Sequence, residues 1–450
     1  MLFEFVDNEE PLESLELRRK FENFLKEIWA NRYFAYSQEI QEDDAAGNFL
    51  NYSKQPFLIF DGVNYRTQNY VGFIQYDKQL IEIYPKVFKQ SGIHKDEVLR
   101  HIFYWFSYCK KLNFPVLENS LDNLNVNDIP ELLIWNFADY CFNTISTQPF
   151  RQYETVEEPL NTPKGRINFP AYIKNGLSTG NYQNIDCIYE PFLYDNRLNR
   201  AIKYVCRLLL NMAKLAETRN KIEEIIFVLD EVEDEPCNVV ELDKIVFNRM
   251  YEEYAPIKEW CKRVIEQQLY SSSNYNSFQW SLLLPMEYVF EDFIYGFIKR
   301  HFNNHFLEIK DQKSNYYLAK GNGEDIFQLR HDILLRRKLE NGSDETIIID
   351  TKYKVRSIED LKDKKRGIAS SDMYQMVSYA YRRGCKKVIL LYPSGVSSTN
   401  QGDEYEIKTD FPNMPEIKIY AYEIPFWDVD SYKNIESRLN KELSRILGID

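Results

Sequence analysis

The chain has 450 residues, about three times the size of an average domain, so two or three domains are expected. Hydrophobic residues make up 44% of it, and Gly (16) and Pro (17) are few, which excludes collagen-like and largely disordered chains. The 69 acidic residues outnumber the 56 basic ones. A net charge of -13 excludes a protein that binds nucleic acid through overall positive charge.

The charge is nevertheless uneven along the chain. Residues 1–45 carry 12 acidic and 5 basic side chains, whereas residues 351–400 carry 4 acidic and 11 basic ones. Any nucleic-acid binding is therefore expected in the later part of the chain.

Cysteine usage and the start of the chain indicate its compartment. The seven cysteines are odd in number and scattered, without a C-x-x-C pair, as expected of reduced thiols in the cytoplasm. The acidic first residues do not resemble a signal peptide, and no run of 18 apolar residues occurs. We expect a soluble, cytoplasmic protein without contact to a membrane.

The first half of the chain mixes helical and strand patterns. Apolar residues recur at spacings of three and four from Leu12 to Ile28, which predicts an amphipathic helix. Short β-rich runs with turn residues between them predict a small sheet over 56–87. Further helices are expected at about 95–110, 128–145 and 198–212 and on to about 269, with short strands and turns over 150–192.

A domain boundary is expected at SSSNYNS (271–277), where small polar residues cluster. After it, the patterns predict an α/β order with a sheet and flanking helices. The expected elements are a helix over 286–300, strands over 305–310, 325–337 and 346–353, a helix over 371–383, strands over 386–392 and 416–422, and a helix over 431–446.

The most informative segment is ETIIIDTKYKV (345–355). Its run from Thr346 to Ile349 is typical of a buried strand and ends in Asp350-Thr351-Lys352. Because side chains alternate along a strand, Asp350 and Lys352 are expected on one face and Thr351 on the other. The carboxylate can hold a cation such as Mg²⁺, and the lysine can orient or deprotonate an attacking water. An acid-x-base triplet alone is weak, since roughly nine are expected by chance.

Other acids upstream strengthen this pattern. Asp332 lies in the strand-like run FQLRHDILLRR, and Glu287 and Glu291 lie four residues apart on the 286–300 helix. Each has a structural alternative: Asp332 can pair with Arg330, Arg336 or Arg337, and the glutamates can form a solvated helix face. Together, a helix acid, a strand acid and a strand acid-x-Lys have the layout of a metal-dependent nuclease site.

The next helix adds polar side chains beside this candidate site. Gln375 and Tyr379 lie four residues apart on a helix expected to begin at a Ser371 or Asp372 cap, and both can bond a DNA phosphate or an ordered water. The alternative is a half-buried helix whose tyrosines pack. Basic residues flank the helix and suit a rim that binds the DNA backbone: Lys362, Lys364, Lys365, Arg366, Arg382, Arg383, Lys386 and Lys387.

Other sites are disfavoured. His301 and His305 are helix-spaced but have no third soft ligand for zinc in evident reach, and His331-Asp332 lacks the further histidines of the helical phosphohydrolases. No G-x-x-x-x-G-K-[ST] motif occurs, and GNGED (321–325) lacks a lysine and a helix to hold phosphates. If nucleotide energy is used, another protein must bind the nucleotide.

The set Glu291, Asp332, Asp350-Thr351-Lys352 and Gln375-x-x-x-Tyr379 resembles the PD-(D/E)xK nucleases with a Q-x-x-x-Y helix. Three further segments, YVGFIQYDKQLIEIYPKV (70–87), RQYETVEEPLNTPKGRINFP (151–170) and YDNRLNRAIKYV (194–205), resemble the McrC family, the nuclease subunit of the McrBC modification-dependent restriction systems. McrC-like proteins often carry Arg-Gly-Arg where this chain has Lys164-Gly165-Arg166.

The resemblance implies an α+β multidomain chain in three regions. These are a β-rich docking domain (1–150), a mostly helical connecting region (151–275) and a restriction-endonuclease-like PD-(D/E)xK domain (276–450). The expected partners are double-stranded DNA and a hexameric McrB-like AAA+ GTPase, which recognises methylated cytosine and which this chain binds and stimulates.

The resemblance also assigns roles to the site residues. Asp332 and Asp350, with Glu291 directly or through water, would hold Mg²⁺ or Mn²⁺, Lys352 would position the attacking water, and Gln375 and Tyr379 would hold the DNA strand. Glu287 could take the place of Glu291, which we prefer because it follows Phe290 as in the relatives. The recognised base, the partner's nucleotide, the stoichiometry and the contact residues are not determined by the sequence.

Two alternatives to a partner-dependent nuclease remain open. The first is a non-catalytic activator or scaffold of an AAA+ partner with a degenerate nuclease fold, which the complete Asp, Asp and Lys set disfavours. The second is a nuclease without a partner, which the size of the first 275 residues disfavours.

Overall fold

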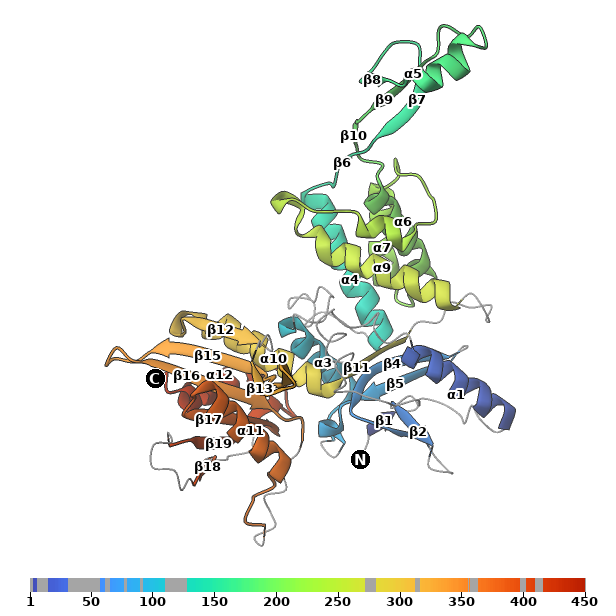
Figure 1. Cartoon of the computed structure of the whole chain (residues 1–450). Coiled ribbons are helices and arrows are strands. Elements are labelled where there is room, and N and C mark those ends of the chain that lie inside the picture. The colour runs from blue at the N-terminus through green and yellow to red at the C-terminus, as the bar shows by residue number, and fades with distance from the viewer. Residues whose placement is uncertain are drawn as a thin grey trace. The chain divides into compact units, whose positions relative to one another are not determined.

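The structure is a computed structural model of the whole chain (Figure 1). It describes residues 3–5, 15–30, 57–60, 65–76, 79–89, 92–109, 128–271, 281–311, 316–354, 356, 363–396, 402–408 and 416–449. The chain forms two compact units: one comprises Met1–Leu112, Glu118–Ile129 and Ser281–Asp450, and the other Asn113–Leu117 and Pro130–Trp280. Helices and sheets occur in both units, which confirms a mixed α/β multidomain chain.

The first unit joins segments that lie far apart in the chain in one sheet. Strand β11 (Ser281–Pro285) pairs antiparallel with β4 (Tyr70–Tyr76), in a sheet with the order β1-β5-β4-β11. At the crossing, Gly72 has φ +138°, and a Cβ there would lie 1.9 Å from the Leu282 carbonyl oxygen, so only glycine fits. The other elements of this region are β1 (Phe3–Phe5), α1 (Leu15–Ala30), β2 (Leu58–Phe60), β3 (Tyr65–Thr67), β5 (Gln79–Tyr84), the 3₁₀ turn η2 (Lys86–Phe88) and α3 (Lys95–Tyr108).

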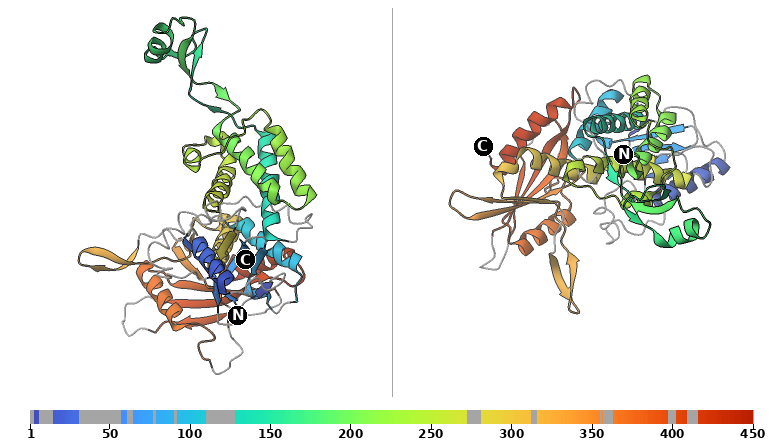
Figure 2. Two further views of the ribbon diagram at one scale, coloured as in Figure 1. Left: turned by 90° about the vertical axis from the view of Figure 1, so that its right-hand side faces the viewer. Right: turned by 90° about the horizontal axis from the view of Figure 1, so that it is seen from above.

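The same unit contains a six-stranded mixed sheet with the order β12-β15-β16-β17-β19-β18 (Figures 1 and 2). Central strand β17 runs parallel to β16 and β19, and the outer pairs are antiparallel. The strands are β12 (Glu308–Asp311), β15 (Ile333–Lys338), β16 (Asp344–Thr351), β17 (Lys387–Gly395), β18 (Asp403–Glu406) and β19 (Lys418–Trp427), and the helices are α10 (Met286–His301), α11 (Ser370–Arg383) and α12 (Lys433–Leu447).

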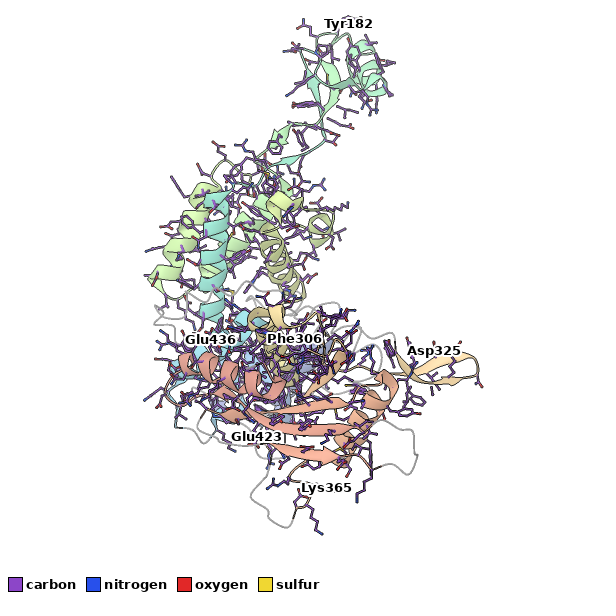
Figure 3. The ribbon with its side chains drawn as sticks, turned by 90° about the vertical axis from the view of Figure 1, so that its left-hand side faces the viewer. Tyr182, Phe306, Asp325, Lys365, Glu423 and Glu436 are labelled. Carbon is purple, nitrogen blue, oxygen red and sulfur yellow. The ribbon has the colours of Figure 1, made fainter. Side chains whose placement is uncertain are left out.

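The order after residue 280 agrees with the sequence patterns, apart from local differences. The single strand expected over 325–337 is two strands, because the chain breaks between β14 (Glu324–Gln328) and β15. Strand β14 instead forms a hairpin with β13 (Tyr317–Gly321), and Asp325 lies on this hairpin where it projects from the sheet (Figure 3). Helix α10 ends at His301, and His305 lies in the short turn η6 (Asn303–His305), so these two histidines do not share a helix.

The second unit consists of a helical group and a small β region. Its helices are α4 (Ile129–Thr147), α6 (Arg197–Met212), α7 (Ala216–Val228), α8 (Val239–Asp243) and α9 (Tyr254–Ser271). Between α4 and α6 the chain forms the strand pair β6 (Gln152–Tyr153) and β10 (Phe192–Leu193) and a sheet of β7 (Val156–Leu160), β9 (Ile185–Tyr189) and β8 (Arg166–Ile167). The same segment contains α5 (Phe169–Tyr172) and the π-helical turn η4 (Ile173–Leu177). The 3₁₀ turn η5 (Arg249–Tyr251) follows α8.

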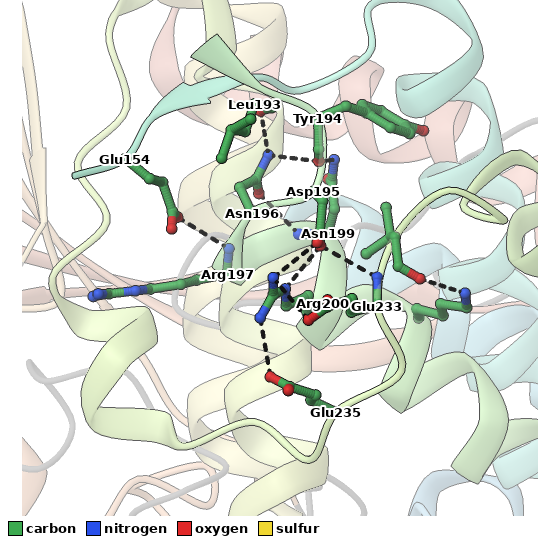
Figure 4. A network of polar contacts seen from close by, with 12 residues as sticks. Glu154, Leu193, Tyr194, Asp195, Asn196, Arg197, Asn199, Arg200, Glu233 and Glu235 are labelled. Carbon is green, nitrogen blue, oxygen red and sulfur yellow. Dashed lines mark hydrogen bonds and ion pairs between the residues drawn. The ribbon is translucent and has the colours of Figure 1, made fainter. Parts of the chain in front are cut away.

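Polar contacts fix the point where the small β region rejoins the helices (Figure 4). Asn196 accepts the backbone N–H of Asn199 and so caps α6, while its amide donates to the Tyr194 carbonyl oxygen at 3.0 Å. Asp195 accepts two hydrogen bonds from Arg200, at 2.7 and 2.8 Å. Arg200 also pairs with Glu233 and Glu235, which holds part of the acidic run over 229–236 against α6.

The predicted regions 1–150, 151–275 and 276–450 remain a prediction, and most of the expected linker at 271–277 lies outside the described residues. All seven cysteines lie within the described residues, and none of them forms a disulfide bond. Among the described helices, none combines the length and hydropathy needed to span a bilayer.

Candidate functional site

The candidate site is built on the end of strand β16. Residues Ile347 to Ile349 are fully buried, because β16 lies between two other strands and is covered by helices. Ile348 packs with Met376 and Tyr379 of α11, so Asp350 and Lys352 continue the face directed at that helix. The expected shared face of Asp350 and Lys352 agrees with this packing.

Asp350 and Lys352 form a buried ion pair. The Lys352 Nζ lies 2.6 Å from Asp350 Oδ2, and Asp350 is only 1% exposed. Burial, followed by the charge of Asp332, raises the pKa of Asp350 to about 7 against the opposing charge of Lys352. Burial alone would lower the pKa of Lys352, but the charges of Asp350 and Asp332 outweigh it and raise that pKa, so the lysine is an ammonium at neutral pH.

Asp332 lies beside this pair through Thr351. It precedes β15 directly, and its Oδ2 accepts the Thr351 backbone N–H at 2.6 Å and the Thr351 hydroxyl at 2.8 Å. Arg336 and Arg337, expected as alternative partners of Asp332, pair with Asp344 and Glu345. Asp332 is thus held at the end of the β15–β16 pair, where its charge acts on Asp350.

Helix α11 contributes Gln375 and Tyr379, which bond each other and the strand. Lys352 Nζ donates to Gln375 Oε1 at 3.4 Å, and Gln375 Nε2 donates to the Tyr379 hydroxyl at 2.7 Å. The Tyr379 hydroxyl donates to the Arg330 carbonyl oxygen, two residues before Asp332. Burial and then the charges of Asp350 and Asp332 raise the pKa of Tyr379, so it remains a neutral hydroxyl.

The predicted cap of this helix is wrong. Helix α11 begins at Ser370, and Ala369 occupies the N-cap position without a side-chain hydrogen bond. Asp372 lies in the first turn, where a carboxylate favours the helix N-terminus, and it pairs with Lys354 at 3.3 Å.

The two candidate helix acids differ in their surroundings. Glu291 is buried on α10, which packs against β16, and its charge contributes to the raised pKa of Tyr379. Glu287 is exposed and accepts a hydrogen bond from Asn69 at 2.8 Å. Glu291, rather than Glu287, therefore lies near enough to Tyr379 for its charge to act on that residue of the candidate site.

The basic rim is only partly available for a ligand. Lys364 is exposed, but Arg366 pairs with Asp403, and Arg383 lies 3.5 Å from the centroid of the Tyr316 ring. Arg382 donates to the Tyr317 carbonyl oxygen. Lys362 lies outside the described residues. The sequence indicated Asp372 only as a possible helix cap and not as a site residue, although its charge also acts on Asp350 and Lys352.

The donor set suits a hard cation, but it is small. Asp332 and Asp350 offer carboxylate oxygens, and their mutual repulsion is the kind that a divalent ion relieves. Within the described part of the chain, no three His, Cys, Asp or Glu side chains lie close enough together to hold a metal ion. A cation here would therefore need water molecules to complete its ligand set, as Mg²⁺ commonly does.

The fold and this site define a multidomain α/β chain with two acids, a lysine and a Gln-Tyr pair at the end of a central strand of a mixed sheet. The family model for "McrBC 5-methylcytosine restriction system component" matches residues 65–393, so the chain belongs to that family. This confirms the resemblance to McrBC systems that the sequence motifs indicate. None of the curated proteins compared with the chain matches it.

Two solved structures are similar in fold. A chain of the refined half-complex from the tetradecameric assembly of Thermococcus gammatolerans McrB AAA+ hexamers with bound McrC is 16% identical, with a TM-score of 0.65 over 98% of each chain. A chain of the T. gammatolerans McrBC complex is 15% identical, with a TM-score of 0.48 over 67% of this chain and 86% of that one. The first likeness extends over nearly the whole chain and shows a shared fold.

The buried charge of Asp350 should reduce stability. An acid whose folded pKa lies above its unfolded value destabilises the folded state once the pH exceeds that value, by about 1.4 kcal/mol for each pKa unit. We therefore expect Asp350→Asn to raise the melting temperature at pH 8 with divalent ions chelated. The control Asp344→Asn, on the exposed end of the same strand, should not raise it. A lower melting temperature for Asp350→Asn would contradict the account of this site.

Proposed function

We propose that the chain is the DNA-cleaving subunit of a McrBC-type restriction complex, with a PD-(D/E)xK nuclease fold in residues 276–450. The observation that carries this proposal is the convergence of Asp332, Asp350, Lys352 and Gln375 at the end of β16. The buried carboxyl of Asp350, with its raised pKa, is costly for stability. Beside it, Lys352 contacts the exposed amide of Gln375. A costly buried acid next to a group that solvent can reach is typical of a reaction site.

The proposed reaction is the hydrolysis of a DNA phosphodiester. Asp332 and Asp350 would hold Mg²⁺, or Mn²⁺, with Glu291 acting through water, and the bound ion would stabilise negative charge on the phosphate and lower the pKa of water. Because the pKa of Lys352 is raised, this lysine suits a fixed ammonium that orients the attacking water better than it suits a base. Gln375 would hold Lys352 in place, and Gln375 and Tyr379 would bind the DNA strand beside it.

The proposed partner is a hexameric McrB-like AAA+ GTPase, which the chain would bind and stimulate through residues 1–275. Support comes from the McrC of T. gammatolerans, which is bound to McrB AAA+ hexamers. The second unit also exposes large apolar side chains on its small β region, including Tyr153 (66%), Phe169 (61%) and Tyr182 (63%). Exposed apolar surface of this kind is typical of a binding surface for another protein.

One observation favours a second function, that of a non-catalytic activator of the AAA+ partner. This observation is the lack of a group of three metal-binding side chains among the described residues. In that case the buried Asp350–Lys352 pair would be a remnant that only holds the sheet together.

Loss of Lys352 should separate cleavage from assembly. We expect Lys352→Ala to reduce DNA cleavage at least about 100-fold, because one preorganised charged donor contributes roughly that much. Complex formation with the AAA+ partner should be unchanged. The matched control is Lys338→Ala, an exposed lysine at the far end of β15. Normal cleavage by Lys352→Ala would exclude the role given to this lysine.

Metal binding distinguishes the nuclease from the activator. Calorimetric titration with Mn²⁺ should show binding that Asp350→Ala removes and Asp344→Ala retains, because only Asp350 lies beside Asp332. Heats that are identical for all three proteins would favour the activator.

A further inference from the structure

Lys86, in the early segment LIEIYPKV, lies against the catalytic strand of the proposed nuclease. Strand β5 ends at Tyr84, and after Pro85 the chain turns so that Lys86 begins η2. Its Nζ donates to Asn69 Oδ1 at 2.9 Å and to the Tyr353 carbonyl oxygen at 3.4 Å. The ammonium also lies 5.0 Å from the centroid of the Tyr353 ring. Lys86 thus contacts the residue that follows Lys352.

Asn69, the second partner of Lys86, contacts the start of α10. Its backbone carbonyl oxygen accepts the Met286 N–H at 2.8 Å, and its amide donates to Glu287 Oε1 at 2.8 Å. Glu291 follows Glu287 by about one helical turn. One lysine and one asparagine from the N-terminal sheet therefore connect the helix that carries Glu291 to the strand end that carries Lys352.

The backbone at this strand end is tightly turned. The Lys352 N–H donates to the Leu391 carbonyl oxygen at 2.9 Å, and the Lys354 N–H donates to the Lys352 carbonyl oxygen at 2.7 Å, which closes a three-residue turn around Tyr353. The Tyr353 carbonyl oxygen lies in this turn and is the group that Lys86 binds. The position of Lys352 therefore depends on what holds the turn.

Aromatic packing also holds Tyr353. The Tyr353 ring is buried, 6.1 Å from the ring of Phe290 and 6.2 Å from that of Phe426. Phe426 stacks on Trp105 of α3 with centroids 4.0 Å apart, and Trp105 Nε1 donates to the Phe426 carbonyl oxygen. The ring is therefore held by packing, and the carbonyl group by the lysine.

We propose that Lys86 is a positioning residue for the proposed nuclease reaction, fixing Lys352 through the Tyr353 carbonyl oxygen and α10 through Asn69. The inference rests on the proposed function. It assigns the N-terminal sheet a role in the geometry of the nuclease site, and it gives Glu287 a structural place beside Asn69.

The two acceptors of Lys86 are neutral carbonyl groups, and burial lowers its pKa. The charge of Glu287 opposes this effect of burial, but a partly buried ammonium is still less favourable than an exposed one. An exposed lysine would serve solubility equally well, so the placement of Lys86 is best explained by the two groups that it joins.

The test compares Lys86→Met with Lys95→Met in cleavage kinetics and in hydrogen exchange. Methionine keeps the length of the side chain and removes the donor. Lys95 is the control because its ion pair with Glu82 belongs to the same region. We expect Lys86→Met to lower kcat about 10- to 100-fold with KM within about twofold, since small misplacements of catalytic groups have effects of this size. Lys86→Arg, which keeps a donor, should recover most of kcat.

Hydrogen exchange keeps the inference separate from the proposed function. In Lys86→Met, but not in Lys95→Met, the amides of Lys352 and Lys354 should exchange faster, whether or not the protein cleaves DNA. If the unsubstituted protein does not cleave DNA, the proposed function fails, and faster exchange would still establish the contact. Unchanged exchange, or a Lys86→Met protein with a normal kcat, would overturn the inference.

Discussion

The structure of the candidate site depends on one buried ion pair, that of Asp350 with Lys352. Removing a carboxylate from water is costly unless charge and hydrogen bonds compensate it. Here the compensation is incomplete, because the charge of Asp332 opposes that of Lys352 and the pKa of Asp350 stays raised. A fully paired acid would stabilise the sheet and leave nothing for a ligand, whereas the charge of Asp350 is only partly compensated here, at the end of a buried strand.

The scaffold around the pair explains how that charge is maintained. Strand β16 lies inside a six-stranded sheet, so its end cannot move without breaking two strand pairs. Helix α11 and the Asp332 segment close the site from two directions through Tyr379 and Thr351. The N-terminal sheet adds a third support, because β11 pairs with β4 immediately before α10 begins. The six-stranded sheet and the N-terminal sheet therefore belong to one compact unit.

Much of this arrangement follows from sequence periodicity. The apolar run before Asp350 predicts a buried strand, and the spacing of Gln375 and Tyr379 predicts one helix face, because both depend only on local geometry. The break in the chain before Asp332 is not visible in the pattern. At this point the Thr351 N–H donates to the Asp332 carboxylate instead of to the backbone of a longer β15. The start of α11 at Ser370 is missed because its N-cap residue, Ala369, makes no side-chain hydrogen bond and so leaves no capping signal in the sequence.

Contacts between distant segments could not be predicted from these patterns at all. Lys86 and Tyr353 are separated by 267 positions, and the pairing of β11 with β4 joins segments that look independent in the sequence. Such contacts depend on how whole helices and strands pack against each other. The spacing of apolar residues and the composition of a segment do not determine that packing. The family motifs locate the acids and the lysine, but they do not show that the segment 79–87 supports the same site.

The central claim is that this chain cuts DNA as part of a partner-dependent complex. The most direct test mixes it with the AAA+ protein encoded beside it, Mg²⁺, GTP and plasmid DNA with or without methylated cytosine. The account predicts cleavage only when both proteins, Mg²⁺, GTP and the modified base are present. Faster GTP hydrolysis on mixing without any cleavage would contradict the account, and would identify the chain as an activator.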